Sequence, residues 1–282
     1  MTWTLRAAGL ADLSLIPDEG YAVLGYDLGF PEIRAVTDLN ADGDGETDLT
    51  QYFGARVVTL EVRVTGTAVE RQNRVMTLRR YMAPNLRVEL LWDAGYGPVR
   101  MLGRADRFAA VVGEAMTRQV ARVGWRVASG LIESQTVTQT VILPGAGAVT
   151  GRVYDLEFDR VYPAGSTPGQ ALINVGGTAP VWPLLRLYGP CTLPDVQIVT
   201  SGARWRFAAG GVLTLLAGDW VDIDTYARTV KLNSVTSILQ YVAPSTLAWG
   251  GFSPGVCDVQ FLVTSGGSET TRLEVFHRDS WY

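Results

Sequence analysis

The residue types best able to do chemistry gather in one acidic segment, DLNADGDGETD, which runs from Asp38 to Asp48. Oxygen-bearing side chains alternate along its first half and Gly43 follows them, which is the opening pattern of a calcium-binding loop. The twelfth position of such a loop falls on Leu49 instead of a bidentate glutamate. We therefore favour an acidic hairpin loop that uses Asp-Gly turn chemistry, and we keep calcium binding as a hypothesis. The candidate ligands are Asp38, Asn40, Asp42 and Asp44.

The sequence contains few residues that could support nucleophilic catalysis. The chain has one histidine, His277, in a strand-like run near the C-terminus. A Ser/His/Asp or Cys/His arrangement would depend on that residue alone, so we interpret it as an ordinary strand histidine. The two cysteines, Cys191 and Cys257, are interpreted as buried thiols. No nucleophile elbow, Walker loop or HExxH motif occurs. We expect neither an enzyme nor a bound cofactor.

Composition restricts the kinds of partner. Of 282 residues, 47% are hydrophobic and 18% are charged, which is typical of a globular chain and not of a disordered one. The 28 acidic and 24 basic residues give a net charge of -4, which disfavours stable nucleic-acid binding. No segment is apolar over the roughly 18 residues of a membrane helix, and the N-terminal segment does not resemble a secretory signal. We expect a soluble protein made in a cytoplasm, with no membrane insertion.

Alternation of apolar and polar residues indicates many β-strands. It runs through Val57 to Val64, and shorter runs repeat it at Leu86 to Leu90, Val123 to Val127, Val153 to Phe158, Val259 to Val263 and Leu273 to His277. A single helix is expected over Val69 to Met82, because apolar residues recur there at spacings of three and four. Those residues are Val75, Leu78 and Met82. The sequence therefore predicts an all-β protein with one helix.

The length favours two domains, at about 150 residues per domain. Between Gln135 and Thr150 the polar alternation gives way to a stretch of Pro, Gly and Ala without charge, so we place the division near residue 140. The expected domains are residues 1–140 and 141–282. A second stretch, Pro163 to Gln170, is expected to form a long loop early in the second domain, with a linker as the alternative.

The second half carries the most specific pattern, spread over Ala171 to Tyr282. Its elements are Asn174, Gly177 and Thr178 before Pro183; Gly189 and Pro190 before Pro194; Gly218, Asp219, Asp222 and Asp224 leading to Arg228, Thr229, Val230 and Asn233; and the closing Arg278, Asp279 and Trp281. In this order and spacing the pattern resembles the distal tail proteins of long, non-contractile-tailed bacteriophages. The first half is similar more loosely, through Gly54, Arg56 and the strand after them.

This resemblance implies an N-terminal, β-barrel-like, ring-forming domain with one helix, and a C-terminal galectin-like or jelly-roll β-sandwich. It implies a structural virion protein that forms a homo-hexameric hub at the virion tail tip after assembly in the host cytoplasm. The hub would join the tail tube protein to a tail tip or baseplate hub protein, with the tape-measure protein as a further partner, and would let the genome pass during ejection. The acidic segment Asp38 to Asp48 has no counterpart in this resemblance.

The same residues also allow a purely physical interpretation. In GDWVDIDTYARTVKLN, Trp220 to Ile223 is expected to form a strand, Asp224 to Ala227 a turn and Thr229 to Leu232 the returning strand. Asp224 and Thr225 are expected to hydrogen-bond local backbone amides in that turn. The carboxylates of this hairpin are therefore interpreted as structural.

The alternative function is a carbohydrate-binding β-sandwich that recognises a host-surface glycan. Eight tryptophans are present, and Trp205 and Trp249 are the candidate sugar-stacking platforms. Most tryptophans are nevertheless expected in cores and interfaces, because their large area is usually buried. An enzyme is the third interpretation, and it lacks a catalytic constellation.

Overall fold

The computed structural model describes residues 2–39, 46–112, 119–146, 169–265, 267–268 and 270–282. Within these residues the protein is mostly β-strand with one α-helix, which confirms the all-β prediction. The chain divides into two compact units, Met1–Thr136 with Trp281–Tyr282, and Val137–Ser280. The two last residues thus belong to the first unit, an arrangement that a single division near residue 140 does not describe.

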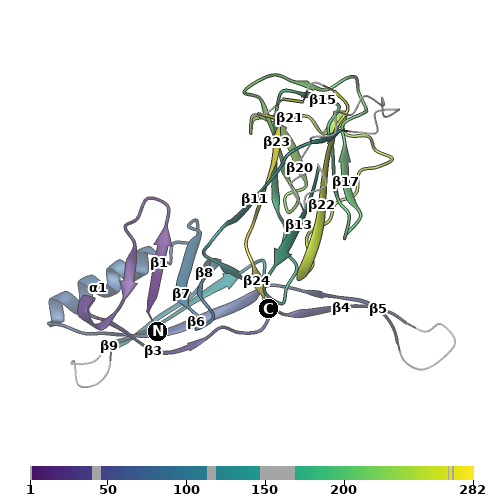
Figure 1. Cartoon of the computed structure of the whole chain (residues 1–282). Helices are drawn as coiled ribbons and strands as arrows, with labels where there is room; N and C mark the ends of the chain where they lie inside the picture. The colour runs from purple at the N-terminus through teal and green to yellow at the C-terminus, as the bar shows by residue number, and fades with distance from the viewer. Residues whose placement is uncertain (1, 40–45, 113–118, 147–168, 266, 269) are drawn as a thin grey trace, which may run out of the picture. The chain divides into compact units, whose positions relative to one another are not determined.

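The first unit is built on one antiparallel sheet with the strand order β2-β1-β7-β8-β9-β6-β3 (Figure 1). Its strands are β1 (Trp3–Ala7), β2 (Leu13–Leu15), β3 (Tyr21–Asp27), β6 (Arg56–Val64), β7 (Val88–Asp93), β8 (Pro98–Val112) and β9 (Gln119–Val127). The short strands β10 (Ile132–Ser134) and β24 (Ser280–Trp281) also belong to this sheet. Alternation governs burial: in β6, Val58, Leu60 and Val62 are at most 1% exposed. One face of the sheet therefore lies on the core and the other faces outward.

This sheet must curl, because its two end strands are neighbours in the chain. If seven strands lay flat at a spacing of about 4.8 Å, the end strands would be about 29 Å apart. β2 and β3 are joined only by Ile16 to Gly20, and the chain from Leu15 to Tyr21 spans at most about 21 Å when fully extended. The connection is also folded back, with the Tyr21 N–H donating to the Ile16 carbonyl at 3.0 Å. This curvature agrees with the barrel-like sheet expected of the first half.

The helix α1 (Ala68–Arg80) packs its apolar stripe on this sheet. Val75, Leu78 and Met82 are at most 9% exposed, as their spacing predicts. The helix begins with a capping box: the Thr67 hydroxyl accepts a hydrogen bond from the Glu70 N–H at 3.3 Å, and the Glu70 carboxylate accepts one from the Thr67 N–H at 2.8 Å. Two otherwise unpaired donors at the helix start are thereby satisfied.

We expect Thr67→Ala to lower the free energy of unfolding of the first unit by about 1 kcal/mol, because it removes the side-chain half of the capping box. Urea denaturation followed by circular dichroism measures the change. Thr67→Ser is the control, since it keeps the hydroxyl and should stay near the wild-type value. A loss of the same size in both variants would show that the methyl group matters and the cap does not.

Two further strands, β4 (Ile33–Leu39) and β5 (Glu46–Phe53), form a separate two-stranded antiparallel sheet, which we call the arm (Figure 1). Its register pairs Ile33 with Phe53 and Leu39 with Glu46, with an irregularity between Val36 and Thr37. Residues 40–45, which connect the two strands, lie outside the described residues. A short 3-10 helix, η1 (Pro17–Glu19), precedes β3 in the same unit.

The second unit contains two larger sheets (Figure 1). Their buried side chains form one core. The first sheet has the order β11-β23-β14-β19-β20-β21, with β11 (Thr138–Ile142), β14 (Leu184–Tyr188), β19 (Trp220–Asp224), β20 (Thr229–Leu232), β21 (Thr236–Ser237) and β23 (Arg272–His277). The second has the order β12-β22-β16-β17 with β13 beside β22, and comprises β12 (Gly145–Ala146), β13 (Gln170–Val175), β16 (Asp195–Ile198), β17 (Ala203–Arg206) and β22 (Gly255–Val263). The shared core makes this unit a β-sandwich.

Smaller elements complete the second unit: the pair β15 (Cys191–Thr192) and β18 (Thr214–Leu215), and the 3-10 helix η2 (Leu239–Tyr241). The strand expected at Val153 to Phe158 and most of the loop expected at Pro163 to Gln170 lie outside the described residues. Among the helices that the structure describes, none has both the length and the apolar character needed to span a membrane.

Candidate functional site

The described part of the chain holds no group of three or more His, Cys, Asp or Glu side chains arranged for a metal ion. The candidate calcium ligands Asn40, Asp42 and Asp44 lie outside the described residues, as does the side chain of Asp38. Asp38 itself is placed in β4, where it pairs with Thr47 of β5. The calcium hypothesis therefore stays a prediction.

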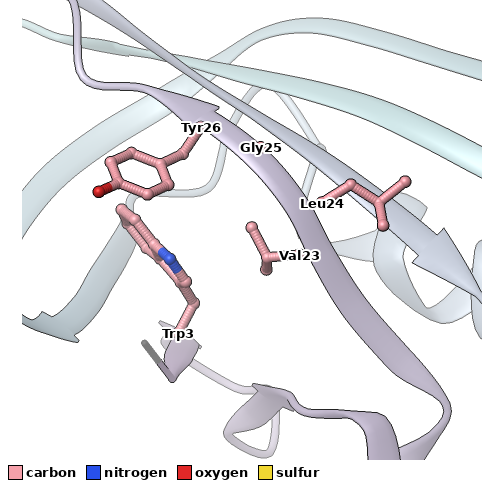
Figure 2. Close-up of a pocket in the computed structure, with 5 residues that line it drawn as sticks. All are labelled: Trp3, Val23, Leu24, Gly25 and Tyr26. Atoms are coloured by element: carbon pink, nitrogen blue, oxygen red, sulfur yellow. The ribbon is translucent and has the colours of Figure 1, made fainter.

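A surface pocket in the first unit is lined by a short run of β3 and by Trp3. It is lined by Trp3, Val23, Leu24, Gly25 and Tyr26, and Figure 2 shows the indole of Trp3 facing the Tyr26 ring. Their ring centroids are 5.6 Å apart, and Trp3 also stacks on Trp92 at 4.7 Å. Its lining contains no carboxylate, imidazole, amine, guanidinium or thiol. The Tyr26 phenol is the one titratable side chain of this lining, and it has no second acid, base or nucleophile beside it there.

His277 and the two cysteines are core residues of the second unit. His277 is 3% exposed and meets the Phe252 ring edge-on, with the centroids 5.8 Å apart. Burial lowers the pKa of its imidazole, and the Asp279 carboxylate, 3.9 Å away, opposes that shift. Cys191 and Cys257 are free thiols, as predicted, and burial raises the pKa of Cys191 to about 11. These groups are unsuited to nucleophilic chemistry.

Trp205 cannot serve as the sugar-stacking platform expected of it. Its ring is 0% exposed and belongs to the core of the second unit, where it meets Trp249 at a centroid distance of 5.7 Å. Trp249 is half-buried and packs on the same core. A sugar ring stacks on an open aromatic face, and Trp205 has none. Its large area instead contributes to the sandwich core.

The carboxylates of the β19–β20 hairpin hold the fold together, in agreement with the physical interpretation of this segment. Asp219 accepts hydrogen bonds from the Asn233 amide at 3.1 Å and the Leu216 N–H at 3.1 Å, and Asp224 accepts one from the Ala227 N–H at 2.8 Å. Thr225 differs from the expectation. It is fully buried, and its hydroxyl donates to the carbonyl of Pro183, 2.7 Å away, instead of binding a local amide.

Asp222 is the one acidic side chain of this hairpin that forms a close ion pair. Its carboxylate lies 2.7 Å from the Arg186 guanidinium and accepts a hydrogen bond from the Ser234 hydroxyl at 2.5 Å. Burial raises the pKa of Asp222, but the hydrogen bonds from Arg186 and Ser234 outweigh it and hold the pKa below its ordinary value. This pair joins two neighbouring strands of one sheet, since Arg186 and Asp222 are opposite each other in the β14–β19 register.

We expect this ion pair to make the second unit sensitive to acid. A carboxyl group whose pKa is lower in the folded than in the unfolded state stabilises the fold above the unfolded pKa of about 3.9, and that stabilisation is lost as the pH falls through the folded pKa. Asp222→Asn should therefore be less stable than wild type at pH 7, and the difference should shrink below about pH 4. Urea titrations at several pH values measure this. Arg186→Gln should converge in the same way, and a difference that stays constant with pH would contradict the assignment.

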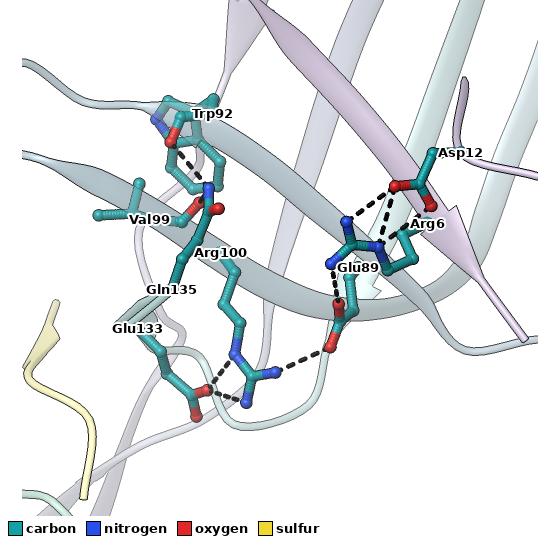
Figure 3. Close-up of polar contacts among 8 residues, drawn as sticks. All are labelled: Arg6, Asp12, Glu89, Trp92, Val99, Arg100, Glu133 and Gln135. Atoms are coloured by element: carbon teal, nitrogen blue, oxygen red, sulfur yellow. Dashed lines mark hydrogen bonds and ion pairs between the residues drawn. The ribbon is translucent and has the colours of Figure 1, made fainter. Parts of the chain in front are cut away.

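In the first unit, part of the outward sheet face is held by paired charges (Figure 3). The Arg100 guanidinium lies 2.8 Å from Glu89 and 2.8 Å from Glu133, and Arg6 lies 2.7 Å from Asp12. Figure 3 also shows the Gln135 amide donating to the backbone carbonyl of Val99, at 2.8 Å. Each arginine on this part of the face has a carboxylate partner.

The outward face of this sheet has a different charge pattern over β6, the second half of β8 and β9. Its outward positions there carry five arginines, which we call the arginine face: Arg63, Arg104, Arg107, Arg122 and Arg126. Arg104 and Arg126 are directly opposite each other in the register of β8 and β9. Only Arg122 forms an ion pair with a described carboxylate, that of Glu61 at 3.5 Å, and its side chain is 67% exposed. Glu61 and Asp106 are the carboxylates of the same strand segments, so the five arginines outnumber the carboxylates there.

Comparison with known proteins adds the fold relationship. No protein-family model matches the sequence, and no curated protein is significantly similar to it. The crystal structure of the SPP1 Dit (gp 19.1) protein, described as a paradigm of the hub adsorption apparatus in phages that infect Gram-positive bacteria, matches 100% of this chain and 100% of that chain. The TM-score is 0.66 and the sequence identity 11%.

The chain has the fold of SPP1 Dit. The fold implied by the family resemblance is thus the fold observed. A chain of the phage P2 baseplate in its activated conformation with Ca is similar at a TM-score of 0.49 and 10% identity, over 99% of this chain and 97% of that chain. At these identities the relationship concerns the fold, and function has to be argued separately.

The motifs of the resemblance have a structural role within this Dit-like fold. The Thr178 N–H donates to the Ser280 carbonyl at 2.9 Å, and Gly177 forms a β-bridge with Ser280. The Gly176 N–H donates to the Asp279 carboxylate at 2.8 Å. Residues about a hundred positions apart in the sequence are therefore hydrogen-bonded to each other. We call this contact, between Gly176 to Thr178 and Asp279 to Ser280, the clasp. It explains why the segment near Gly177 and the closing segment belong to the same pattern.

Sequence reasoning did not identify the arginine face. Its signal is present, because arginines occupy the polar phase of the same alternating strands whose apolar phase was used to predict them. Which strands are neighbours, and therefore that Arg104 meets Arg126, depends on the sheet order, which alternation does not contain.

Proposed function

We propose that this protein is a structural component of a phage tail: a distal tail hub whose first unit closes into a ring and whose second unit is a galectin-like sandwich. The observation that carries the proposal is the fold shared with SPP1 Dit over the full length of both chains. The protein would be assembled in the host cytoplasm and would reside at the virion tail tip.

The proposed mechanism is assembly and not bond chemistry. Within the described residues, the histidine, both cysteines and the carboxylates of the β19–β20 hairpin serve packing or hydrogen bonding. A ring requires a head-to-tail interface between two different patches of the subunit, repeated until it closes. The arm and the arginine face are two such patches in the first unit, and neither is used in that unit's large core.

The proposed partners follow from this role. The ring would be a homo-hexamer that joins the tail tube protein on one side to a tail tip or baseplate hub protein on the other, with the tape-measure protein as a further contact. The genome would pass through the ring during ejection. A net charge of -4 suits a channel that must not retain DNA, because phosphate binding depends on an excess of basic side chains.

Mass photometry and electron microscopy of the purified full chain, alone and mixed with the tail tube protein, test the proposal. We expect closed rings in at least one of the two samples. A protein that stays monomeric in both, over the concentration range in which tail proteins assemble, would overturn the ring.

A glycan-binding role of the second unit is the second candidate, and one observation favours it. Trp182 and Tyr226 are 39% and 64% exposed, and their rings lie 6.5 Å apart at 69°. An exposed aromatic pair of this kind can stack on sugars. A glycan array with the wild-type chain and with Trp182→Ala tests it: binding that is lost in the variant while assembly persists would support this role, and no binding by the wild type would exclude it.

A further inference from the structure

We propose that His277 makes the clasp sensitive to acid. A proton taken up by the buried imidazole favours an open form of the clasp, in which the Asp279 carboxylate leaves the Gly176 N–H and pairs with the imidazolium. The residues involved all belong to the second unit, so the inference does not depend on ring formation.

The His277 imidazole is enclosed and unpaired. Its side chain is 0% exposed, and within the described residues neither ring nitrogen has a hydrogen-bond partner. An imidazole carries at least one N–H in either protonation state, and a buried donor without a partner destabilises a fold. Most buried polar groups are paired, so this exception requires an explanation.

One carboxylate oxygen connects the imidazole to the clasp. The Oδ1 atom of Asp279 accepts the hydrogen bond from the Gly176 N–H, 2.8 Å from that nitrogen, and lies 3.9 Å from the Nε2 atom of His277. Charge-assisted hydrogen bonds of this kind are about 2.7–2.9 Å long, so the carboxylate is about 1 Å too far from the imidazole to form one. In the closed clasp Asp279 therefore pairs with Gly176 and leaves His277 without a partner.

The other described groups around the imidazole are uncharged. In β11, Thr138 lies opposite it in the strand register, and the Phe252 ring meets it edge-on. Asn174 of β13 faces it with the backbone, and Arg278, the next residue in the chain, does not shift the imidazole pKa. Asp279 is thus the charged group that the imidazolium can use as a partner.

Burial decides whether acid opens or closes the clasp. It lowers the pKa of the His277 imidazole, and the Asp279 carboxylate and the Asn174 backbone oppose that shift without cancelling it. In the open clasp the ring reaches water and its pKa returns to about 6.5. The open form therefore binds the proton more tightly. Acid favours opening as the pH falls from about 6.5 through the lower pKa of the closed clasp.

The clasp adjoins one of the chain connections between the two units. Ser280 is the last residue of the second unit, and the chain continues into the first unit at Trp281. The Ser280 carbonyl accepts the Thr178 and Ala179 N–H groups at 2.9 and 3.1 Å, beside the bond that Asp279 makes. Opening the clasp therefore loosens the attachment of this connection, while the sheets of the sandwich keep their own pairing.

Hydrogen exchange and NMR of the full chain test the proposal. The chain has one histidine, so a single set of imidazole signals reports its titration. We expect those signals to titrate with a pKa below 6.5. Between pH 7 and pH 5 the protection factor of the Gly176 amide should fall by about 10-fold, whereas the amides of Leu185 and Val221 in the sandwich core should keep theirs.

Two variants separate the proton from the carboxylate. His277→Phe keeps a ring against Phe252 and cannot take up a proton, so the Gly176 protection factor should no longer change between pH 7 and pH 5. Asp279→Asn keeps an oxygen acceptor for Gly176 but removes the charge that favours the imidazolium, so the imidazole pKa should fall further. Asp222→Asn is the control, because its effect belongs below about pH 4 and the change at Gly176 should persist in it.

Three results would overturn the proposal. An imidazole pKa above 6.5 with greater Gly176 protection in acid would mean that the proton closes the clasp. Equal losses of protection at Gly176 and in the core would mean that acid unfolds the whole unit. A Gly176 protection factor that stays constant from pH 7 to pH 5 in the wild type would mean that His277 and the clasp are not coupled. These measurements on the wild type decide the matter even if His277→Phe fails to fold.

Discussion

Replacing Trp205 by alanine is expected to lower the free energy of unfolding of the second unit by about 3–5 kcal/mol, the range found when large aromatic core residues are truncated. The indole is 0% exposed, lies opposite Val196 in the β16–β17 register and contacts the Trp249 ring, so its removal leaves a cavity lined by rigid strands. Urea denaturation followed by far-ultraviolet circular dichroism should show the transition of the second unit shifted and that of the first unit unchanged.

Trp205→Phe is the matched control, because it keeps an aromatic ring and should lose much less stability. The experiment also decides between the two roles considered for this residue. A core residue loses stability on truncation. An unchanged unfolding transition together with a loss of glycan binding would instead indicate that Trp205 lies on a glycan-binding surface. That result would contradict the buried position described above.

Gly177→Ala is expected to cost at least about 3 kcal/mol, because two penalties coincide. Gly177 has a φ of 88°, a region that side chains other than glycine rarely occupy, and a Cβ atom added there would overlap the backbone carbonyl oxygen of Ser280. That carbonyl also accepts the Thr178 N–H, so it cannot move away without breaking the clasp. The unfolding transition of the second unit measures the loss.

Gly202→Ala provides the comparison within the same unit. Its φ is 72°, but a Cβ atom added there would have no heavy atom within 4 Å. Only the backbone penalty of about 1 kcal/mol should remain. Equal losses at the two positions would mean that the close approach of Gly177 to Ser280 is not what makes this glycine necessary.

Periodicity was sufficient to predict the elements with one buried face. The alternation of Leu60, Val62 and Val64 with polar residues predicted β6, and the recurrence of Val75, Leu78 and Met82 predicted α1 within two residues at each end. Both patterns come directly from the geometry of a single strand or helix against a core. The free, buried state of Cys191 and Cys257 was predicted on a different ground, because one possible bridge in a chain of this length is no disulfide framework.

Features that depend on which segments become neighbours could not be predicted in this way. Thr225 was assigned to a local turn, but its hydroxyl finds the Pro183 carbonyl, which lies 42 positions away in the sequence. The arm was likewise not foreseen as a separate sheet, because its strands alternate no differently from strands that join a larger one. Trp205 illustrates the same limit: its residue type suits a core and a sugar platform equally well, and only its burial decides.

Because Trp281 and Tyr282 belong to the first unit, the second unit is an insertion within the first unit, and two chain connections join the two units instead of one. The Trp281 ring lies 4.9 Å from that of Tyr96, and the Tyr282 ring 4.2 Å from that of Phe53. A shortened chain that stops at residue 136 would therefore lack two aromatic side chains of the first unit, those of Trp281 and Tyr282. A deletion variant that keeps the first unit complete has to remove residues 137–280 and join residue 136 to Trp281.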